Sequence, residues 1–388
     1  MNIPFLKRFQ LGIVNQTINW LNFLLFLINK KIFKNISFKP KNILIYKIGN
    51  IGDIICAVPS FIAIRRFYPE AKITLLSSPG KFEAVGAKEF FSNCWYFDHL
   101  KIYYSEDTTS LKGKKKLINE LKSENYDLFV QLPDDLAGFK TLLRNIIFAK
   151  LIGVKKAFGF KIRTIQLCKK TQVDYTTQKT EVESLLDLLK ENGIMVQKTE
   201  YDFNVSENQK KKIAGLLENK WGRIKNEYLV VVNPGGKREA NRWPAENFGE
   251  IGKYLQEKYN AKIIIIGGKE DIPRAETIQK FLDSDNSLVL VNQLELLEIL
   301  ELLKKASFIV SNDTGAVHMA AAVNLLVLGL YCIRNILGRW LPYGENHEII
   351  YHKFLNCDYR KEECIKKSIE AITVGEVKTA CDRVISRL

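Results

Sequence analysis

The first 52 residues of this 388-residue chain contain no acidic side chain, and Asp53 is the first one. A second stretch without Asp or Glu runs from Leu136 to Val173 and carries nine Lys or Arg residues. With a formal net charge of +15, such a chain attracts nucleic acid, anionic lipid or an anionic substrate. No nucleic-acid-binding motif is present, so we expect a lipid surface or an anionic substrate as partner, and no nucleic acid.

Long hydrophobic runs are also missing. The uninterrupted apolar run near the amino terminus, Phe23 to Ile28, is far shorter than the roughly 20 residues of a membrane span. No small-residue cleavage site follows it. Residues 1–40 are instead typical of a basic amphipathic helix lying in a membrane interface, flanked by Lys7-Arg8 and Lys30-Lys31. The alternative is a helix docked on the protein itself.

Cysteines are few and irregularly placed. The seven are an odd number without C-x-x-C spacing, in a chain large enough to need no disulfide, so we expect a reducing cytoplasm. Cys357, Cys364 and His352 do not have the spacing of a zinc site. We therefore expect no metal and no cofactor.

From Lys41 onward, short apolar strands alternate with helical segments, which predicts an α/β protein with parallel sheets. A polar stretch at about 206–226 separates two such sets. We predict an amino-terminal domain over 41–220 and a carboxy-terminal domain over 221–388, whose last helix is a candidate to pack back on the first domain. The predicted strands are Asn42–Tyr46, Ile73–Leu76, Asp127–Gln131, Tyr228–Asn233, Lys262–Ile266, Leu288–Val291 and Phe308–Val310.

Ligands in open α/β sheets bind beyond the carboxyl ends of the strands, so the segments that follow the strands matter most. The first is K-I-G-N-I-G-D, Lys47 to Asp53, in which Gly49 and Gly52 permit a tight turn before a helix predicted from Ile54. Asp53 is either a helix N-cap or a base, because its positive neighbourhood favours the ionised carboxylate.

The second segment, Asn233 to Pro244, reads N-P-G-G-K-R-E-A-N-R-W-P. Its Gly235, Lys237 and Arg242 suggest diphosphate binding, with a solvated loop as the alternative. The third, Gly267 to Asp271, offers Glu270 or Asp271 for a ribose diol, or is a charged surface turn.

The fourth segment, S-N-D-T-G-A-V-H, follows the predicted strand at Phe308–Val310. We expect a turn over Ser311–Thr314 with outward amides, and a helix dipole that favours an anion. Thr314 adds a hydroxyl, Gly315 lets the backbone approach a ligand, and Asp313 and His318 could complete the pocket. The alternative is an ordinary helix cap with His318 packed inside.

In order and spacing, these four motifs and R-W-L-P-Y-G at Arg339 to Gly344 resemble glycosyltransferase family 9, the heptosyltransferases of lipopolysaccharide core assembly. The resemblance runs from about Lys41 to Gly344. It implies a GT-B fold, with two Rossmann-like doubly wound domains facing a cleft, in addition to the amino-terminal helix. It also implies inverting, metal-independent sugar transfer.

The resemblance assigns roles to individual residues. Asp53 would be the general base, and the donor nucleotide sugar would be bound by Gly235, Lys237, Arg242, Glu270, Asp313, Thr314, Gly315 and His318. Acceptor-side candidates are Gly52, Gln131, Lys140 and Arg144. Asn241 stands where the family commonly has a lysine that neutralises the leaving diphosphate, so Arg242, Lys237 or Arg238 would have to supply that charge. Gln131 stands where an acid is frequent.

The leading hypothesis is therefore an inverting glycosyltransferase that moves a sugar, with ADP-heptose as the expected donor, onto a lipopolysaccharide core or related anionic glycolipid. It would work in the cytoplasm, peripherally on the inner face of the cytoplasmic membrane. Two alternatives stay open. One is a sugar-nucleotide epimerase of the same GT-B architecture, and the other is a non-catalytic envelope-glycan binding protein.

Overall fold

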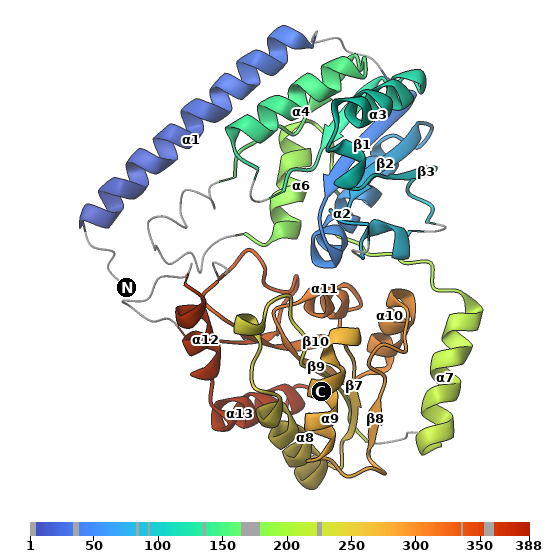
Figure 1. Ribbon diagram of the computed structural model, residues 1–388, viewed down its shortest axis with the longest axis vertical. Coiled ribbons are helices and arrows are strands. Elements are labelled where there is room, and N and C mark those ends of the chain that lie inside the picture. Colours follow the sequence, from blue (N-terminus) through green and yellow to red (C-terminus); the bar gives the residue numbers. More distant parts are fainter. Residues whose placement is uncertain are drawn as a thin grey trace. The chain divides into compact units, whose positions relative to one another are not determined.

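The computed structural model describes residues 5–33, 39–82, 85–91, 94–134, 137–163, 179–222, 227–334, 337–352 and 361–388. Part of the second acid-free stretch, 164–173, and Cys357 lie outside these residues. The chain separates into two compact units, Met1–Asp202 and Phe203–Leu388 (Figure 1). The polar stretch before residue 220 forms a helix, α7 (Glu207–Trp221), that belongs to the second unit.

The first unit is built on a five-stranded parallel sheet in the order β3-β2-β1-β4-β5. Strand β1 is central because its apolar residues Ile43, Leu44 and Ile45 are fully buried, as expected for a strand covered on both faces. The elements are α1 (Phe5–Ile32), β1 (Asn42–Ile48), α2 (Ile51–Phe67), β2 (Lys72–Ser78), β3 (His99–Ile102), α3 (Leu111–Ser123), β4 (Leu128–Gln131), α4 (Phe139–Leu151), β5 (Lys156–Phe158) and α6 (Glu181–Glu191).

Helix α1 lies beside α4 (Figure 1) and docks on the first unit. Its buried Ile18 and Leu25 join the core that contains Leu44 and Phe129. Asn22 locks the contact, donating to the carbonyl of Ile162 at 3.1 Å and accepting from its amide at 2.7 Å. The alternative of a helix docked on the protein itself is therefore confirmed for the face that carries Ile18, Asn22 and Leu25.

The opposite face of α1 also carries large apolar side chains. Trp20, Phe23 and Phe26 are 60%, 55% and 57% exposed. Helical periodicity places Trp20 and Phe23 across the helix from Ile18 and Leu25, and Phe26 beside Phe23 on the flank of that face. Among the helices of the described residues, none has the length and apolar character that crossing a membrane requires.

The second unit has a six-stranded parallel sheet in the order β11-β10-β9-β6-β7-β8. In each sheet the chain therefore enters at a central strand and adds the next two strands on one side. It then crosses to the other side of the central strand and adds the remaining strands there. Besides α7, the elements are β6 (Leu229–Asn233), α8 (Ala245–Tyr259), β7 (Lys262–Ile265), α9 (Ile272–Gln279), β8 (Ser287–Val289), α10 (Leu296–Lys305), β9 (Phe308–Asn312), α11 (Gly315–Ala322), β10 (Leu326–Tyr331), β11 (Glu348–Tyr351), α12 (Glu362–Glu370) and α13 (Val374–Ile385).

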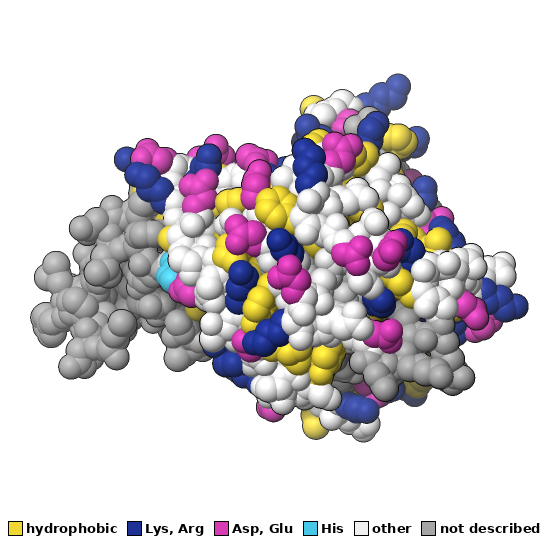
Figure 2. Space-filling model, turned by 90° about the horizontal axis from the view of Figure 1, so that it is seen from below, with side chains coloured by type: hydrophobic (Ala, Val, Ile, Leu, Met, Phe, Trp, Pro, Cys, Tyr) yellow, Lys and Arg dark blue, Asp and Glu magenta, His cyan; other side chains and the backbone are white. Residues whose placement is uncertain are grey.

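The core of the second unit includes both carboxy-terminal helices. Val377, Ala380 and Val384 of α13 and Ile365 of α12 are fully buried in the cluster that contains Trp243. The last helix thus packs on its own unit. On the face that Figure 2 displays, acidic and basic side chains are interspersed, so no single-sign patch forms there.

One cysteine departs from the sequence-based expectation. Cys56, Cys94, Cys332 and Cys381 are free thiols, but Cys364 is disulfide-bonded. The cysteine spacing in the sequence does not indicate this bond. Pairing depends on the distance between Cα atoms in the fold, which sequence spacing does not give.

Candidate functional site

Asp53 lies in the first turn of α2, just after central strand β1. The helix begins at Ile51, three residues earlier than predicted, so Gly52 and Asp53 lie inside it. The Asp53 Oδ2 atom accepts a hydrogen bond from the amide of Asn50 at 2.9 Å, as a capping residue does. Gly49, at φ 153°, makes room for it, since a Cβ there would lie 2.2 Å from Asp53 Cβ.

The electrostatics of Asp53 differ from the sequence-based expectation of a strongly ionised carboxylate. The pKa of Asp53 is raised to about 6, mainly by burial and to a smaller extent by nearby Asp134 and Glu181, while Lys47 and the Asn50 amide limit the rise. The desolvation cost outweighs the positive neighbourhood. A carboxyl group with this pKa is largely ionised at pH 7 and can still take up a proton.

A buried ion cluster that sequence reasoning missed lies behind Asp53. Lys47 and Glu181 are both inaccessible to solvent, with Lys47 Nζ 3.4 Å from Glu181 Oε1. Arg163 Nη1 contacts the other Glu181 oxygen at 2.6 Å. Because Lys47 and Glu181 are 134 residues apart, no local pattern could pair them. The two charges act on Asp53 in opposite directions, since Lys47 lowers its pKa and Glu181 raises it.

The acceptor-side candidates occupy two places in the first unit. Gln131 ends β4 in register with Tyr46 of β1 and is buried, accepting from Asn145 Nδ2 at 3.1 Å. It therefore lies, like Asp53, at the carboxyl ends of the strands, but its side-chain oxygen already accepts a hydrogen bond from buried Asn145. Lys140 and Arg144 are exposed on α4, and the charge of Arg144 acts on Tyr46 and Tyr103.

In the second unit, Asn312 joins two of the predicted segments. It is fully buried, and its Nδ2 donates to the carbonyls of Pro234 and Gly235 at 2.9 and 3.0 Å. Its Oδ1 accepts from the Trp243 amide at 3.1 Å. Ser311 and Asn312 were predicted in a turn but end strand β9, because Asn312 is paired in register with Leu330 of β10.

The D-T-G segment forms the start of α11. Thr314 caps the helix, with its Oγ1 accepting from Ala316 N at 3.3 Å and Asn233 Nδ2 at 2.8 Å. The Asp313 amide donates to Leu330 O at 3.2 Å, so the prediction that the amides of this turn point outward is wrong for Asp313. Gly315 begins the helix.

The hydrogen bonds of the Ser311 hydroxyl determine whether the neighbouring Thr314 hydroxyl has a proton to donate to a ligand. Ser311 Oγ gives its proton to the Asn312 carbonyl at 2.7 Å, so only the Thr314 proton can fill the 3.4 Å contact between the two hydroxyls. That contact is long, and a phosphate oxygen would compete for the proton. His318 is buried edge-on to Trp340, with ring centroids 5.9 Å apart, which fits the packed alternative.

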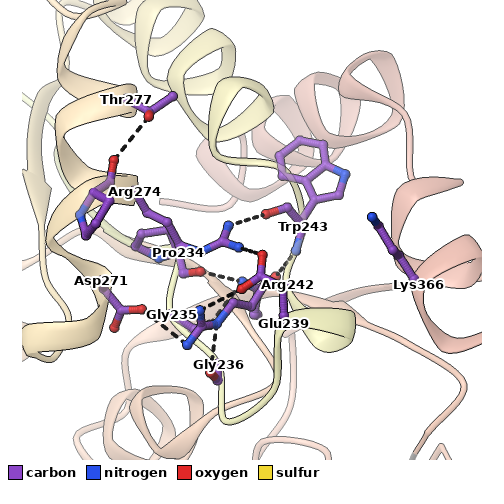
Figure 3. Close-up of polar contacts among 12 residues, drawn as sticks. Pro234, Gly235, Gly236, Glu239, Arg242, Trp243, Asp271, Arg274, Thr277 and Lys366 are labelled. Carbon is purple, nitrogen blue, oxygen red and sulfur yellow. Dashed lines mark hydrogen bonds and ion pairs between the residues drawn. The ribbon is translucent and has the colours of Figure 1, made fainter. Parts of the chain in front are cut away.

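Arg242, a predicted donor ligand, is enclosed by its neighbours (Figure 3). Its Nε donates to Gly236 O and its Nη1 to Glu239, both at 2.8 Å, and its Nη2 lies 3.8 Å from Asp271. Two carboxylates thus balance its charge. A Cβ on Gly235 would lie 2.5 Å from Asp271 Oδ2, so only glycine fits there. Lys237 is exposed in the same loop.

The two acidic side chains of the third segment, Glu270 and Asp271, differ in exposure. Asp271 is buried and accepts from the Gly268 amide at 3.0 Å, and burial raises its pKa. Glu270 beside it is exposed. Of the two acids left open by the sequence, Glu270 is therefore the one accessible to a ribose.

Asn241 has a partner that sequence reasoning missed. Arg334, which follows β10, donates its Nε to Asn241 Oδ1 at 2.7 Å. The apolar run L-V-L-G-L-Y before it could have indicated another strand with a carboxyl end at this edge. In the parts of the chain that the structure covers, no group of three or more His, Cys, Asp or Glu residues could hold a metal ion.

Comparison with known proteins gives this geometry a context. The family model for glycosyltransferase family 9 (heptosyltransferase) matches residues 114–370. Lipopolysaccharide heptosyltransferase 3 of Escherichia coli K12 is 23% identical over 296 residues, which are 76% of this chain and 83% of that protein.

Two solved structures share the fold. A family 9 glycosyltransferase from Veillonella parvula superposes with a TM-score of 0.72 at 16% identity, covering 91% of this chain and 99% of that one. The E. coli ADP-heptose lipopolysaccharide heptosyltransferase II superposes with a TM-score of 0.64 at 18% identity, covering 89% and 99%. The two parallel sheets are thus those of a GT-B fold. Since the family model spans most of the chain, this protein is a glycosyltransferase and belongs to glycosyltransferase family 9.

Proposed function

We propose that this protein is an inverting glycosyltransferase that transfers heptose from ADP-heptose to a lipopolysaccharide core or a related anionic cell-envelope glycolipid. The family match and the E. coli relatives named for heptosyl transfer support the sugar. The ADP-heptose enzyme with the same fold supports the donor. We propose further that the reaction needs no metal.

In this proposal the two units divide the chemistry. Asp53 of the first unit takes the proton of the acceptor hydroxyl while that oxygen attacks the anomeric carbon of the donor sugar. The new carbon–oxygen bond forms as the bond to the donor diphosphate breaks, and configuration at the anomeric carbon inverts. Thr314 and Gly315 of the second unit bind the diphosphate by hydroxyl and amide, and Glu270 binds the ribose.

One observation carries the assignment of the base: Asp53 follows central strand β1 and has a pKa of about 6. A general base works best when its pKa is close to the working pH, because it is then both ionised and able to accept a proton. The position after the central strand is also where open parallel sheets bind ligands.

The proposal is tested by incubating the protein with ADP-heptose and a Kdo-bearing lipid acceptor in the presence of EDTA, with product analysis by mass spectrometry. We expect a heptosylated lipid and free ADP. Parallel arms with GDP- and UDP-sugars identify another donor. If no nucleotide sugar yields a glycosylated lipid, the proposal fails, and a new nucleotide sugar formed without acceptor would indicate an epimerase.

The pH dependence of transfer follows from Asp53. Because the carboxylate is the active form and its pKa is about 6, kcat/KM should rise through pH 6 and level off above about 7. Replacing Lys47 by Met removes the cation that lowers this pKa, so the acid limb should move to higher pH. Exposed Lys39→Met is the matched control and should leave the limb in place. An unchanged limb in Lys47→Met would refute the electrostatic coupling.

We propose that the exposed face of α1 rests on the inner surface of the cytoplasmic membrane. Trp20, Phe23 and Phe26 project from this face, and Lys30 and Lys31 end the helix. Aromatic side chains favour the interface, and the lysines favour anionic lipid. Since the other face is packed on the protein, a docked helix can also be a membrane contact.

Vesicle flotation tests this contact. Full-length protein should float with anionic vesicles, and Trp20→Ser/Phe23→Ser should lower the partition coefficient tenfold or more, because each of the two lost side chains contributes roughly 1.5–3 kcal/mol when fully buried. Leu111→Ser/Met195→Ser is a matched control, because these side chains are 84% and 74% exposed elsewhere in the first unit. Equal flotation of the two double variants would contradict the proposal.

A further inference from the structure

The donor's diphosphate needs a positive charge, and Arg242, one of the three cations that the sequence offers for this task beside Lys237 and Arg238, is already paired with carboxylates. The Arg242 guanidinium is only 13% exposed and lies against Glu239 and Asp271 (Figure 3). Arg274 also pairs with Glu239. Two arginines and two carboxylates therefore form a balanced group. Recruiting Arg242 to a ligand would disturb the contacts of its guanidinium with the Gly236 carbonyl and with buried Asp271, although its partner Glu239 is 72% exposed.

Arg334 is in the opposite situation. Only its Nε has a strong neutral partner, the Asn241 amide oxygen at 2.7 Å. Its Nη2 is buried and makes no hydrogen bond within the described part of the chain. Among the residues that the structure describes, the acid in ion-pair contact with it is Glu362, 3.7 Å from Nη2, and this side chain is 69% exposed and shared with Arg238. The two arginines thus have one solvated carboxylate between them.

The surroundings of Arg334 favour an added anion. Burial lowers its pKa, and the charge of Arg238 lowers it further, so the cation is under-compensated where it stands. A guanidinium has five N–H donors in a planar fork that matches phosphate oxygens. An anion at this place would satisfy the unpaired Nη2 and offset the repulsion between the two arginines.

The position of Arg334 places it near the proposed donor site. It follows β10, which pairs with β9 so that Leu330 lies opposite Asn312. The Asp313 amide donates to the Leu330 carbonyl, so the chain before Thr314 is fixed to the end of β10. Arg334 and the start of α11 therefore leave adjacent strands at the same edge of the sheet.

We infer that Arg334, oriented by its hydrogen bond to Asn241, is the donor-binding residue that neutralises the diphosphate of the nucleotide sugar. This inference rests on the proposed function. Asn241 is then a positioning residue, whose amide oxygen holds the guanidinium where a lysine at 241 would repel it.

The test measures binding of ADP, GDP, UDP and the corresponding nucleosides to the full chain by calorimetry. Arg334→Gln should raise the Kd of the preferred nucleoside diphosphate about 10- to 100-fold and leave that of its nucleoside unchanged, because only the diphosphate loses a charged partner. Arg387→Gln changes the net charge equally at a surface contact with Glu348 and should leave both unchanged.

Asn241→Lys added to Arg334→Gln should restore most of the lost affinity, since a lysine there replaces the missing cation. Arg334→Lys, which keeps the charge, should lose less than Arg334→Gln and serves if the latter does not fold. Wild-type affinity for the diphosphate in Arg334→Gln would overturn the inference, as would wild-type affinity in Arg334→Lys if only that variant folds. If the unaltered protein binds no nucleoside diphosphate, the proposed donor site itself fails, and the inference with it.

Discussion

Replacing Asp53 by Asn is expected to lower the rate of sugar transfer about 1000-fold or more, because an amide cannot take the acceptor's proton. The shape of the side chain is kept, and its oxygen can still accept from the Asn50 amide, as Asp53 does at 2.9 Å. Donor binding, which we assign to the second unit, should therefore be unchanged. The measurement is kcat with ADP-heptose and lipid acceptor, paired with the Kd of ADP.

The same variant should be more stable than the parent at pH 8. The folded-state pKa of Asp53, about 6, lies above its ordinary value of 3.8, so ionising it costs folding energy above pH 6. The cost fades as the pH falls through 6 and is absent below about 4. Because the side chain is partly exposed, we expect a gain of about 1–2 kcal/mol at pH 8.

Asp187→Asn is the control for both measurements. Asp187 lies on α6 in surface contact with Lys190, and its loss should change stability by less than about 1 kcal/mol and leave transfer intact. If Asp53→Asn retains a tenth of the parent rate, Asp53 is not the base. If its Tm follows the parent at every pH, the carboxyl group is not destabilised by burial.

Replacing Asn312 by Ala should destabilise the second unit by about 4 kcal/mol. The change leaves a cavity and removes the partners of three backbone groups, the carbonyls of Pro234 and Gly235 and the amide of Trp243. Each buried group left without a partner costs about 1–3 kcal/mol. The N-P-G-G loop would also be released, so ADP affinity should fall.

Because the chain has two units, hydrogen exchange resolves this effect better than one unfolding curve. Peptides covering 234–243 and strand β9 should lose protection in Asn312→Ala, while those of β1 and β2 should not. Asn247→Ala, at a partly exposed position on α8, should match the parent throughout. Unaltered protection of the Trp243 amide in Asn312→Ala would show that the loop is held by other contacts.

Part of this structure could be predicted from local pattern. The buried strands β1, β6, β7 and β9 read as short apolar runs, and the glycines and polar residues after them marked the sheet edge correctly. The composition of the stretch before residue 220 indicates only that it is polar, and the helix there was not predicted. Ser206 with Gln209 is nevertheless a capping-box pattern that signals the start of α7.

The side-chain contacts could not be predicted, because they join distant residues. The sequence predicts Asn312 in a turn. Its side-chain amide instead holds a loop by donating to the carbonyls of residues 78 and 77 positions earlier in the sequence. The sequence predicts Arg242 as a cation available to the donor, whereas the fold places it beside Asp271. Arg334 and Asn241 are 93 residues apart and meet only because β10 and the Asn241 segment end at one edge.

The parallel pairing of β6 with β9 has a consequence for synthesis on the ribosome. Asn233 can pair with Ser311 only when a further 78 residues have been made, which takes about 4–16 s at usual elongation rates. For that time β6, a wholly apolar strand apart from Asn233, has no β9 beside it. The nascent second unit therefore exposes an aggregation-prone edge, and folding helpers that bind short apolar segments should find it there.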